Sequence, residues 1–393
     1  MNTGNKNILA VNGGSSSIKF SLYAAGDLPA KWLSGKITRI GLQDAELTFT
    51  NTRNNKKDKL PVEAAGLSEA ADLLVGWLRQ QEGAMPLAAV GHRVVHGLGH
   101  RQASVIDDAL LTELESISGY DPDHLPGEIE LIRQFGSRYP NLLQVACFDT
   151  AFHSSLPPVA RLLPIPRRYA SAGLQRYGFH GLSYTYIMEE LLRIAGAPVA
   201  GGRVILAHLG SGASLAAVKD GISVDTTMGF TPVGGIVMGT RPGDVDPGVW
   251  WWLLDKERLD PGKFSHLINQ ECGLLGISET SPDMQDLLEK ESHDPRAAEA
   301  VSLFCYQVKK TIGAYSAVLG GLDTLVFTGG IGERSAAIRS RICSGLGYLG
   351  IELNQRANAH DELFLSAEDT PVGVYAIPTD EEWMIAKTVK HFL

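Results

Sequence analysis

The apolar positions of the chain fall into short runs near its start that predict two strands. Residues 8–11 are all apolar and residues 18–22 alternate between apolar and polar, so both segments predict strands. The glycine and serine stretch at residues 12–17 lies between them with almost no chain before it, which is not the place of a flexible linker. We therefore predict a strand–turn–strand hairpin at the beginning of the chain.

The pattern further along the chain alternates between strand and helix. Four apolar residues recur at helical spacing and predict an amphipathic helix: Leu67, Ala71, Leu74 and Leu78. Apolar runs at residues 87–90 and 141–148 predict further strands, and residues 336–346 predict another helix. Strands that alternate with helices predict an α/β fold in which helices cover both faces of a sheet.

One segment of the second half resembles the first hairpin. Residues 8–18 (ILAVNGGSSSI) align without a gap with residues 205–215 (ILAHLGSGASL), about half the chain later. The first three residues, Gly13 with Gly210, and Ser17 with Ser214 are identical. A repeat on this scale predicts two related domains, each opening with the same hairpin. A single match of this kind can also arise by chance.

Composition and charge narrow the function classes. The chain has 393 residues, 44% of them hydrophobic, which supports two domains of ordinary size. The formal net charge is −9 without a basic block, so we expect no nucleic-acid partner. An anionic small substrate stays possible, because its site would be a local cationic cluster.

The cysteines and the apolar runs indicate the compartment. Four cysteines lie far apart with no CxxC pair, so neither a zinc site nor a disulfide framework is predicted: Cys147, Cys272, Cys305 and Cys343. Reduced thiols are typical of a cytoplasmic protein. The start lacks the apolar region of a signal peptide, and no apolar run reaches about 18 residues, so we expect no contact with a membrane.

Two further segments carry candidate chemistry beside a structural interpretation. Residues 325–334 (LVFTGGIGER) predict a strand followed by a glycine-rich loop and a helix, where backbone N–H groups favour an anion or a nucleotide. A plain structural turn is an equally good interpretation. In residues 374–382 a strand gives way to a helix, and Thr379 with Glu382 matches a capping box, while Asp380 and Glu381 suit a first helical turn.

The first glycine-rich stretch is not one of the common phosphate motifs. A P-loop needs Gly-Lys followed by Ser or Thr and leading into a helix, whereas Lys19 lies within an alternating strand. The stretch also lacks the Gly-x-Gly-x-x-Gly pattern of a dinucleotide site. What remains is a hairpin turn with exposed amides and hydroxyls. Two such turns, one in each domain, could hold a polyphosphate between them.

Several motifs together resemble the acetate kinase family. They occur in the family's order between about residues 8 and 390, and the ordered set is far more specific than any one string. The motifs are residues 12–19 (NGGSSSIK), 91–97 (GHRVVHG), 148–153 (FDTAFH), 176–181 (RYGFHG), 238–244 (MGTRPGD), 273–276 (GLLG), 327–333 (FTGGIGE) and 379–382 (TDEE).

The resemblance implies a fold and a domain division. The fold is the duplicated actin-like (ribonuclease H-like) α/β fold of sugar kinases, with two domains and an active-site cleft between them. We expect the N-terminal domain to comprise residues 1–150 and 384–393, and the nucleotide-binding C-terminal domain to comprise residues 151–383. A homodimer is expected by resemblance alone, and residues 250–252 (WWW) predict either core or dimer surface rather than ligand stacking.

The resemblance also implies a reaction. The family phosphorylates a short carboxylic acid to an acyl phosphate, reversibly and by direct in-line transfer, with ATP as co-substrate and Mg²⁺ (or Mn²⁺) as cofactor. A carboxylate is already ionised at neutral pH, so no general base is needed. The task is to bring two anions together and neutralise the transferring phosphoryl group. Acetate is the expected substrate; propionate or a hydroxylated acid, and a nucleotide-binding regulator without catalysis, are the alternatives.

The family's functional residues carry over onto matching positions. Arg93 and Arg241 match the two arginines that hold carboxylate and phosphoryl oxygens, for which guanidinium geometry is suited. His180 matches the donor to the transferring group and Asp149 the catalytic aspartate. Asn12 and Glu381 match the magnesium-associated residues, and the implied substrate pocket contains Arg93, Val95, Phe179 and Pro232. The implied nucleotide-binding residues are Ser15, Ser17, Lys19, His208, Gly210, Ser211, Gly212, Asp283, Met284, Gln285, Gly329, Gly330, Ile331, Gly332 and Arg334.

The chain departs from the family at a few positions. Residues 121–126 (DPDHLP) stand where the family usually has APLHNP, so Asp123 replaces the leucine that helps to wall the substrate's methyl pocket. A buried unpaired carboxylate there would be costly, so either the loop is shifted or the substrate carries a polar group. The neighbouring His124 matches a family histidine of lesser role. Ser211, Gln285 and Arg334 replace the usual asparagine, arginine and asparagine, which leaves the nucleotide preference open.

Overall fold

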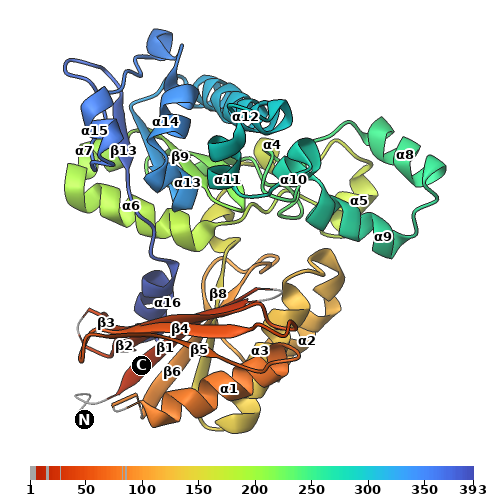
Figure 1. The fold of residues 1–393 in the computed structure, drawn as a ribbon, viewed down its shortest axis with the longest axis vertical. Coiled ribbons are helices and arrows are strands. Elements are labelled where there is room, and N and C mark those ends of the chain that lie inside the picture. Colours follow the sequence, from red (N-terminus) through yellow and green to blue (C-terminus); the bar gives the residue numbers. More distant parts are fainter. Residues whose placement is uncertain (1–5, 15–16, 27, 82, 85) are drawn as a thin grey trace. The chain divides into compact units, whose positions relative to one another are not determined.

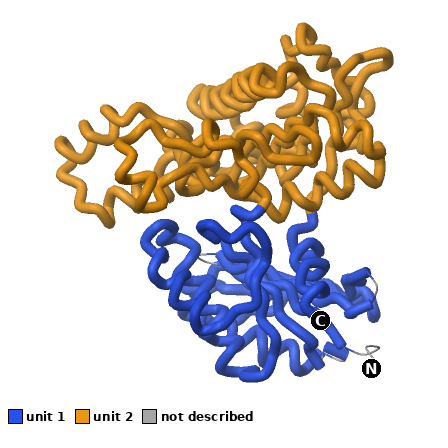
Figure 2. Tube along the Cα trace, turned by 180° about the vertical axis from the view of Figure 1, so that it is seen from behind, with its two compact units in different colours: residues 1–151, 380–393 blue, residues 152–379 orange. Residues whose placement is uncertain are grey.

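The computed structural model describes residues 6–14, 17–26, 28–81, 83–84 and 86–393, and the chain divides into two compact units. Unit 1 comprises residues 1–151 and 380–393, and unit 2 comprises residues 152–379 (Figure 2). The first boundary lies one residue from the expected position. The second lies at 379/380 instead of 383/384, because the whole final helix packs on the strands of unit 1.

Unit 1 is built on an eight-stranded mixed sheet in the order β5-β4-β3-β2-β1-β6-β8-β7 (Figure 1). β2 to β5 form an antiparallel meander, whereas β1, β6 and β8 are parallel neighbours. The strands are β1 (Asn7–Gly14), β2 (Ser17–Ala24), β3 (Ala30–Thr38), β4 (Glu46–Asn51), β5 (Lys56–Pro61), β6 (Leu87–Val94), β7 (Ser104–Val105) and β8 (Leu143–Phe148).

Helices cover both faces of this sheet where β1 and β6 run side by side. A Cβ on Gly13 of β1 would lie 2.3 Å from Leu131 of α3, and a Cβ on Gly91 of β6 would lie 2.4 Å from Ile385 of α16. These glycines therefore let α3 and α16 approach opposite faces closely. The helices of unit 1 are α1 (Leu67–Gln80), α2 (Asp108–Ser116), η1 (Ser118–Tyr120), α3 (Leu125–Arg138) and α16 (Glu381–Lys390).

Unit 2 repeats the central part of the first sheet. Its order is β11-β10-β9-β12-β13, with β9 antiparallel to β10 and parallel to β12. The order β3-β2-β1-β6-β8 of unit 1 has the same sequence of directions. This match confirms the duplication predicted from the alignment of residues 8–18 with 205–215. The strands are β9 (Arg203–Leu209), β10 (Ala213–Lys219), β11 (Ile222–Thr226), β12 (Thr324–Thr328) and β13 (Gly373–Ala376).

The core of unit 2 lies between this sheet and its helices. Tyr184 and Ile187 of α6 pack with Val204 and Leu206 of β9, so α6 lies against the sheet (Figure 1). The helices are α4 (Pro158–Arg161), α5 (Arg167–Ser171), α6 (Gly181–Ala195), α7 (Ala197–Ala200), α8 (Pro247–Lys256), α9 (Pro261–His266), η3 (Leu267–Glu271), α10 (Gly273–Ser278), α11 (Met284–Lys290), α12 (Pro295–Leu319), α13 (Gly329–Arg334), α14 (Ala336–Cys343), η4 (Gly347–Leu349) and α15 (Gln355–Ala359); η2 (Ala151–His153) lies at the boundary.

The predicted capping box at Thr379 is wrong. The N-cap of α16 is Asp380, whose carboxylate accepts the Trp383 N–H at 2.9 Å, so the helix begins one residue later than the box requires. The Thr379 hydroxyl instead donates to Ser183 at 2.9 Å within unit 2. An aspartate caps as well as a threonine, and the Thr379 side chain is already engaged elsewhere.

Two other local findings bear on the sequence analysis. The glycine-rich segment predicted as a loop is itself a short helix, α13, which starts directly at the end of β12. Within the described ranges, no helix is both long enough and apolar enough to cross a bilayer.

Candidate functional site

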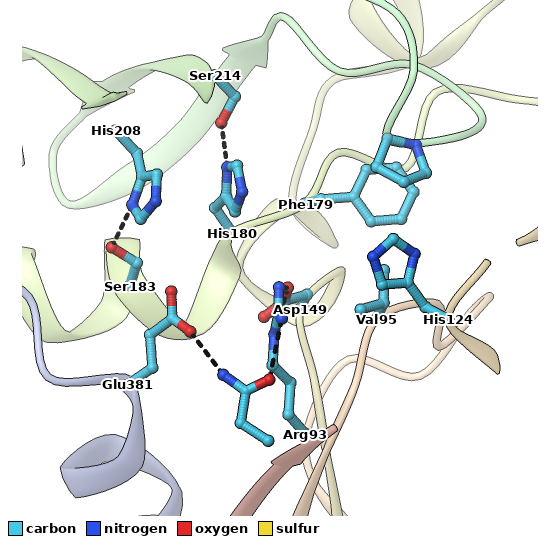
Figure 3. A network of polar contacts seen from close by, with 12 residues as sticks. Arg93, Val95, His124, Asp149, Phe179, His180, Ser183, His208, Ser214 and Glu381 are labelled. Carbon is cyan, nitrogen blue, oxygen red and sulfur yellow. Dashed lines mark hydrogen bonds and ion pairs between the residues drawn. The ribbon is translucent and has the colours of Figure 1, made fainter. Parts of the chain in front are cut away.

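Four polar residues of unit 1 form one connected cluster, here called the unit 1 cluster: Asn12, Arg93, Asp149 and Glu381. The parallel strands β1, β6 and β8 end at the same edge of the sheet and bring Asn12, Arg93 and Asp149 together there. Arg93 donates from Nε and Nη2 to Oδ2 of Asp149 at 3.0 and 2.5 Å. Its Nη1 donates to Oδ1 of Asn12 at 3.2 Å, and Asn12 Nδ2 donates to Glu381 at 3.3 Å (Figure 3).

The unit 1 cluster is partly buried: Asn12 and Asp149 are buried, whereas Arg93 and Glu381 are half-buried. Asp149 is 1% exposed, and burial alone would lower the pKa of Arg93. Asp149, Glu381 and Glu128 outweigh that effect and raise its pKa instead, so the guanidinium stays charged. A fixed, half-buried cation held between acceptors is suited to bind a carboxylate or a phosphoryl oxygen.

A second set of carboxyl groups lies beside this cluster on α3 and the segment before it. Glu128 is buried and accepts the Val95 N–H at 3.1 and 3.3 Å. Burial, followed by the nearby charge of Asp121, raises the pKa of Glu128 well above its usual value, although Arg93 opposes the shift. Glu128 therefore tends to keep its proton while it fixes the backbone at Val95.

The departure at residues 121–126 takes a different form from the one expected. Asp121 is the buried carboxyl of this segment, whereas Asp123 is half-buried. Oδ1 of Asp121 contacts Nδ1 of His124 at 2.8 Å, and Oδ2 is buried without a hydrogen-bond partner among the described residues. His124 is the N-cap residue of α3. The cost expected for Asp123 is avoided because its side chain keeps access to solvent.

Two stacked imidazoles dominate the corresponding region of unit 2. The rings of His180 and His208 lie 4.2 Å apart at 20°, and each residue is only 8% exposed. Nδ1 of His180 contacts Ser214 Oγ at 2.8 Å, and Nδ1 of His208 contacts Ser183 Oγ at 2.8 Å (Figure 3). Each ring is thus anchored through Nδ1 by a buried serine.

Arg241 joins the histidines at the turn between β9 and β10. A Cβ on Gly212 of this turn would lie 2.7 Å from Nη2 of Arg241 and 3.3 Å from Nε2 of His180. Both side chains therefore converge on Gly212, and only a glycine leaves them this space. Nη1 of Arg241 donates to the carbonyl of Pro232 at 2.7 Å, which holds the guanidinium in place. We call His180, His208, Gly212 and Arg241 the unit 2 cluster.

The glycine-rich segment of α13 is fixed from behind by a carboxylate. Gly329 has φ +75°, and a Cβ there would lie 2.7 Å from the Leu209 carbonyl, so the chain requires glycine at this crossing. Oε1 of Glu333 accepts the N–H groups of Gly329 and Thr379, each at 2.9 Å. The fully buried Arg339 donates to the Gly332 carbonyl at 2.8 Å.

The remaining predicted residues lie in several places. Asp283 caps α11 by accepting the Gln285 N–H at 2.7 Å, and Gln285 and Arg334 are exposed. Lys19 is exposed on β2 directly opposite Asn12. The rest of the set divides between buried and partly exposed positions; Ser15 lies outside the described residues. Buried or nearly so are Val95, Phe179, Pro232, Met284, Gly329 and Gly332, and partly or fully exposed are Ser17, Gly210, Ser211, Gly330 and Ile331.

The donor set of unit 1 fits a magnesium ion in part. Among the residues that the structure describes, no group of three or more His, Cys, Asp and Glu side chains could hold a metal ion. Mg²⁺, however, is commonly bound by one or two carboxylates together with water and substrate phosphates. The Glu381 carboxylate, oriented by Asn12, fits that role.

Sequence reasoning missed the residues that hold the functional side chains in place. Ser183 and Ser214 anchor the two imidazoles, and Glu333 and Arg339 fix the glycine segment. Ser214 lies within the repeated segment, where it is identical to Ser17. Serine, glutamate and arginine are common residues with no local pattern that indicates this role, so only the tertiary contacts distinguish these four.

Comparison with known proteins places this geometry in context. The profile of the Acetokinase family matches residues 7–387. The chain is 42% identical over 388 residues to the acetate kinase of Rhodopseudomonas palustris (strain TIE-1), covering 97% of each chain. It is 41% identical to the propionate kinase of Citrobacter rodentium, covering 97% of this chain and 96% of that one. The crystal structure of a propionate kinase from Francisella tularensis superposes with a TM-score of 0.91 at 33% identity, over 98% of both chains.

The burial of Glu128 leads to a prediction about pH and stability. Its raised pKa means that the folded protein holds a proton that the unfolded chain releases near pH 4.5, so this group makes stability fall as the pH rises above that value. Glu128→Gln keeps an oxygen for the Val95 N–H without the charge. We expect the variant to gain on the wild type by about 1.4 kcal/mol per pH unit until the pKa of the folded state is reached.

Urea unfolding at pH 5, 6.5 and 8 measures this difference. Glu130→Gln, on the same helix but half-exposed, controls for the loss of one carboxylate from α3. A difference between Glu128→Gln and wild type that stays constant across the three pH values would contradict the prediction.

Proposed function

Because the chain belongs to the acetokinase family, we propose that it is a kinase that transfers the terminal phosphoryl group of ATP to the carboxylate of a short-chain acid, acetate first. The products are ADP and an acyl phosphate, and the transfer is direct, in-line and reversible. The observation that carries the proposal is the convergence of Arg241 and His180 on Gly212. Such a group of N–H donors without an activated nucleophile suits the neutralisation of a transferring phosphoryl group.

The proposed reaction requires the protein to position the two substrates and to neutralise their negative charge. The acid is already a carboxylate at neutral pH, so it attacks without a general base. Arg93 has a charge that Asp149 maintains and orients, and in our proposal it binds the carboxylate or a phosphoryl oxygen. Arg241 and His180 donate to the phosphoryl oxygens, whose charge grows in the transition state. Asp149 acts through Arg93, to which it is bound.

The cofactor and the nucleotide follow from the same proposal. We assign Mg²⁺, or Mn²⁺ in its place, to Glu381 and Asn12; when bound, it would neutralise phosphate charge. The nucleotide-binding set given in the sequence analysis remains our proposal for ATP. Glu333 and Arg339 fix the backbone at Gly329 and Gly332 through hydrogen bonds, which supports that assignment. The proposal further requires that the unit 1 and unit 2 clusters act on the same pair of substrates.

The acid is the finer part of the proposal. Val95 of unit 1 and Phe179 of unit 2 are apolar residues of the kind that contacts a methyl group, and we keep both as proposed substrate-binding residues. Asp123, which is the reason to consider a polar acid, is half-buried rather than buried in an apolar wall. We therefore propose acetate, with propionate as the second candidate. The names of relatives include both acids.

The oligomeric state and the cellular compartment are also part of the proposal. We propose a homodimer formed through α8, because none of the residues of this helix is buried and Trp251 and Trp252 are 73% and 56% exposed. Trp250 packs edge-on against Phe264, with ring centroids 5.7 Å apart. The cysteines are free thiols, which supports the cytoplasm as the compartment.

Arg241→Ala tests the transfer chemistry. Loss of one preorganised donor to the phosphoryl group should lower the rate of ATP-dependent acyl phosphate formation by about 10³-fold, with circular dichroism and thermal unfolding little changed. Trapping the product with hydroxylamine measures the rate. Arg193→Ala, which removes an exposed arginine paired with Glu190 on α6, serves as the control and should keep the wild-type rate. Unchanged turnover in Arg241→Ala would refute the assignment, and tight ATP binding by the wild type without turnover of any carboxylate would favour a non-catalytic regulator.

A substrate panel with Asp123→Leu tests the identity of the acid. We expect the wild type to prefer acetate over propionate and over hydroxylated acids, with the same order in the variant, because the Asp123 side chain keeps access to solvent. The measured quantity is kcat/KM for each acid with ATP and Mg²⁺. A hydroxylated acid that the wild type prefers and Asp123→Leu rejects would reverse our choice.

Substitution of the α8 tryptophans tests the dimer. Light scattering should give twice the chain mass for the wild type and the single-chain mass for Trp251→Glu combined with Trp252→Glu, since buried charge opposes association. Tyr348→Glu changes another exposed aromatic residue of unit 2, 77% exposed, and should stay dimeric. A monomeric wild type, or a dimer that survives the double substitution, would contradict the proposal.

A further inference from the structure

The anchor of His180 extends beyond Ser214 to a second hydroxyl. Oγ of Ser214 contacts Nδ1 of His180 at 2.8 Å and the phenolic oxygen of Tyr184 at 2.5 Å. Tyr184 lies one turn along α6 from His180, and Ser214 lies on β10. Tyr184, Ser214 and His180 therefore form a continuous chain of polar atoms, here called the hydroxyl relay.

The hydroxyl relay is built into the core of unit 2. Ser214 and Tyr184 are fully buried, and the ring of Tyr184 packs among the apolar residues of α6 and β9. His180 has φ 60° and ψ 25°, a left-handed conformation that is costly for a residue with a side chain. Strain of this kind persists only where the surroundings determine the geometry, which the relay helps to do.

A neutral imidazole carries one proton, and the partner of one ring nitrogen decides which nitrogen bears it. We propose that Tyr184 donates to Ser214 and that Ser214 donates to Nδ1 of His180, so that the ring keeps its proton on Nε2. Nε2 is the nitrogen that faces Gly212, where Arg241 also converges. The relay thereby presents an N–H donor at the place where our proposed function requires one, and this inference rests on that function for its catalytic meaning.

The stacking of His180 on His208 makes it important which ring nitrogen of His180 carries the proton. Two imidazolium charges 4.2 Å apart, with the Arg241 guanidinium nearby, would repel one another in a poorly hydrated region. His180 is therefore best kept neutral. A neutral ring donates through Nε2 only if Nδ1 accepts a hydrogen bond, whereas the other tautomer would turn a lone pair towards the phosphoryl oxygens. Tyr184 and Ser214 are positioning residues in this account, since they act through His180.

His208 provides an internal comparison. Its Nδ1 is anchored by Ser183, whose Oγ also contacts Oγ1 of Thr379 at 2.9 Å. This second chain of hydroxyls ends on an aliphatic alcohol and the Thr379 backbone, which donates to Glu333. The relay at His180 instead includes a phenol, the more acidic and stronger donor of the two, which favours donation towards the imidazole.

The experiment combines tautomer measurement with kinetics in the full-length protein. Protein labelled with ¹⁵N in its histidine rings gives a distinct pattern for each tautomer, and the signals of His180 are identified by their loss in His180→Asn. We expect the Nε2–H pattern in the wild type and a mixture of tautomers in Tyr184→Phe and Ser214→Ala. Acyl phosphate formation should show kcat lowered about 10- to 100-fold in both variants, with KM for ATP and acetate within about threefold of wild type.

The controls separate positioning from a general loss of packing. Thr185→Ala removes a hydroxyl of the same helix, one that donates to the Gly181 carbonyl at 2.8 Å, and should retain the wild-type kcat and tautomer. Ser214→Thr keeps a hydroxyl and should recover kcat relative to Ser214→Ala. If Ser214→Ala does not fold, Tyr184→Phe and the wild-type spectrum decide.

Two results would overturn the inference: a wild-type His180 with its proton on Nδ1, or kcat unchanged in Tyr184→Phe. The tautomer is read without turnover, so the absence of kinase activity in the wild type would refute the proposed function while leaving the relay open to test. A wild-type kinase with the wrong tautomer would do the reverse.

Discussion

The ion pair between the half-buried Arg93 and the buried Asp149 is the interaction on which the unit 1 cluster depends. At the ends of adjacent parallel strands, Asp149 is removed from water and Arg93 is partly so, and the arginine makes the burial of the carboxylate tolerable. Arg93 then orients Asn12, and Asn12 orients Glu381 on a helix from the far end of the chain. Removing either partner would leave the other charge uncompensated and would destabilise unit 1. The intact pair itself adds little net stability, because desolvation offsets its attraction, so its main effect is to fix the geometry.

Unit 2 has the same sheet pattern, but different side chains position its functional residues. Neutral hydroxyls anchor two stacked imidazoles there, and glycines leave room for Arg241 and for the crossing of α13 over β9. The duplicated pair of antiparallel strands thus places strand residues next to the functional residues of each unit. Unit 1 holds an arginine among carboxylates, and unit 2 holds an arginine beside two imidazoles; each unit thus supplies a cation of the kind that a reaction between two anions needs.

Sequence patterns predicted much of the fold, and the family resemblance named the residues that the structure brings together in the unit 1 and unit 2 clusters. The alternation at residues 18–22 and the apolar run at 8–11 became β2 and β1, and the repeat at 205–215 became the matching pair β10 and β9. Where a sequence prediction was wrong, a tertiary contact of the same side chain explains it. Thr379 matched a capping box, yet Ser183 engages its hydroxyl and Asp380 caps the helix. Asp123 matches a family leucine in sequence, but the match does not tell how far each carboxyl of the segment is buried; in the structure Asp121 is buried and Asp123 is half-buried.

We propose that these residues transfer a phosphoryl group between a carboxylate and a nucleotide without releasing it to water. Phosphorus NMR of the wild type with acetyl phosphate, ADP and Mg²⁺ follows this transfer. We expect ATP signals to grow as the acetyl phosphate signal declines, one for one, with little inorganic phosphate formed. Conversion of acetyl phosphate to inorganic phosphate without ATP, or no conversion at all, would contradict it.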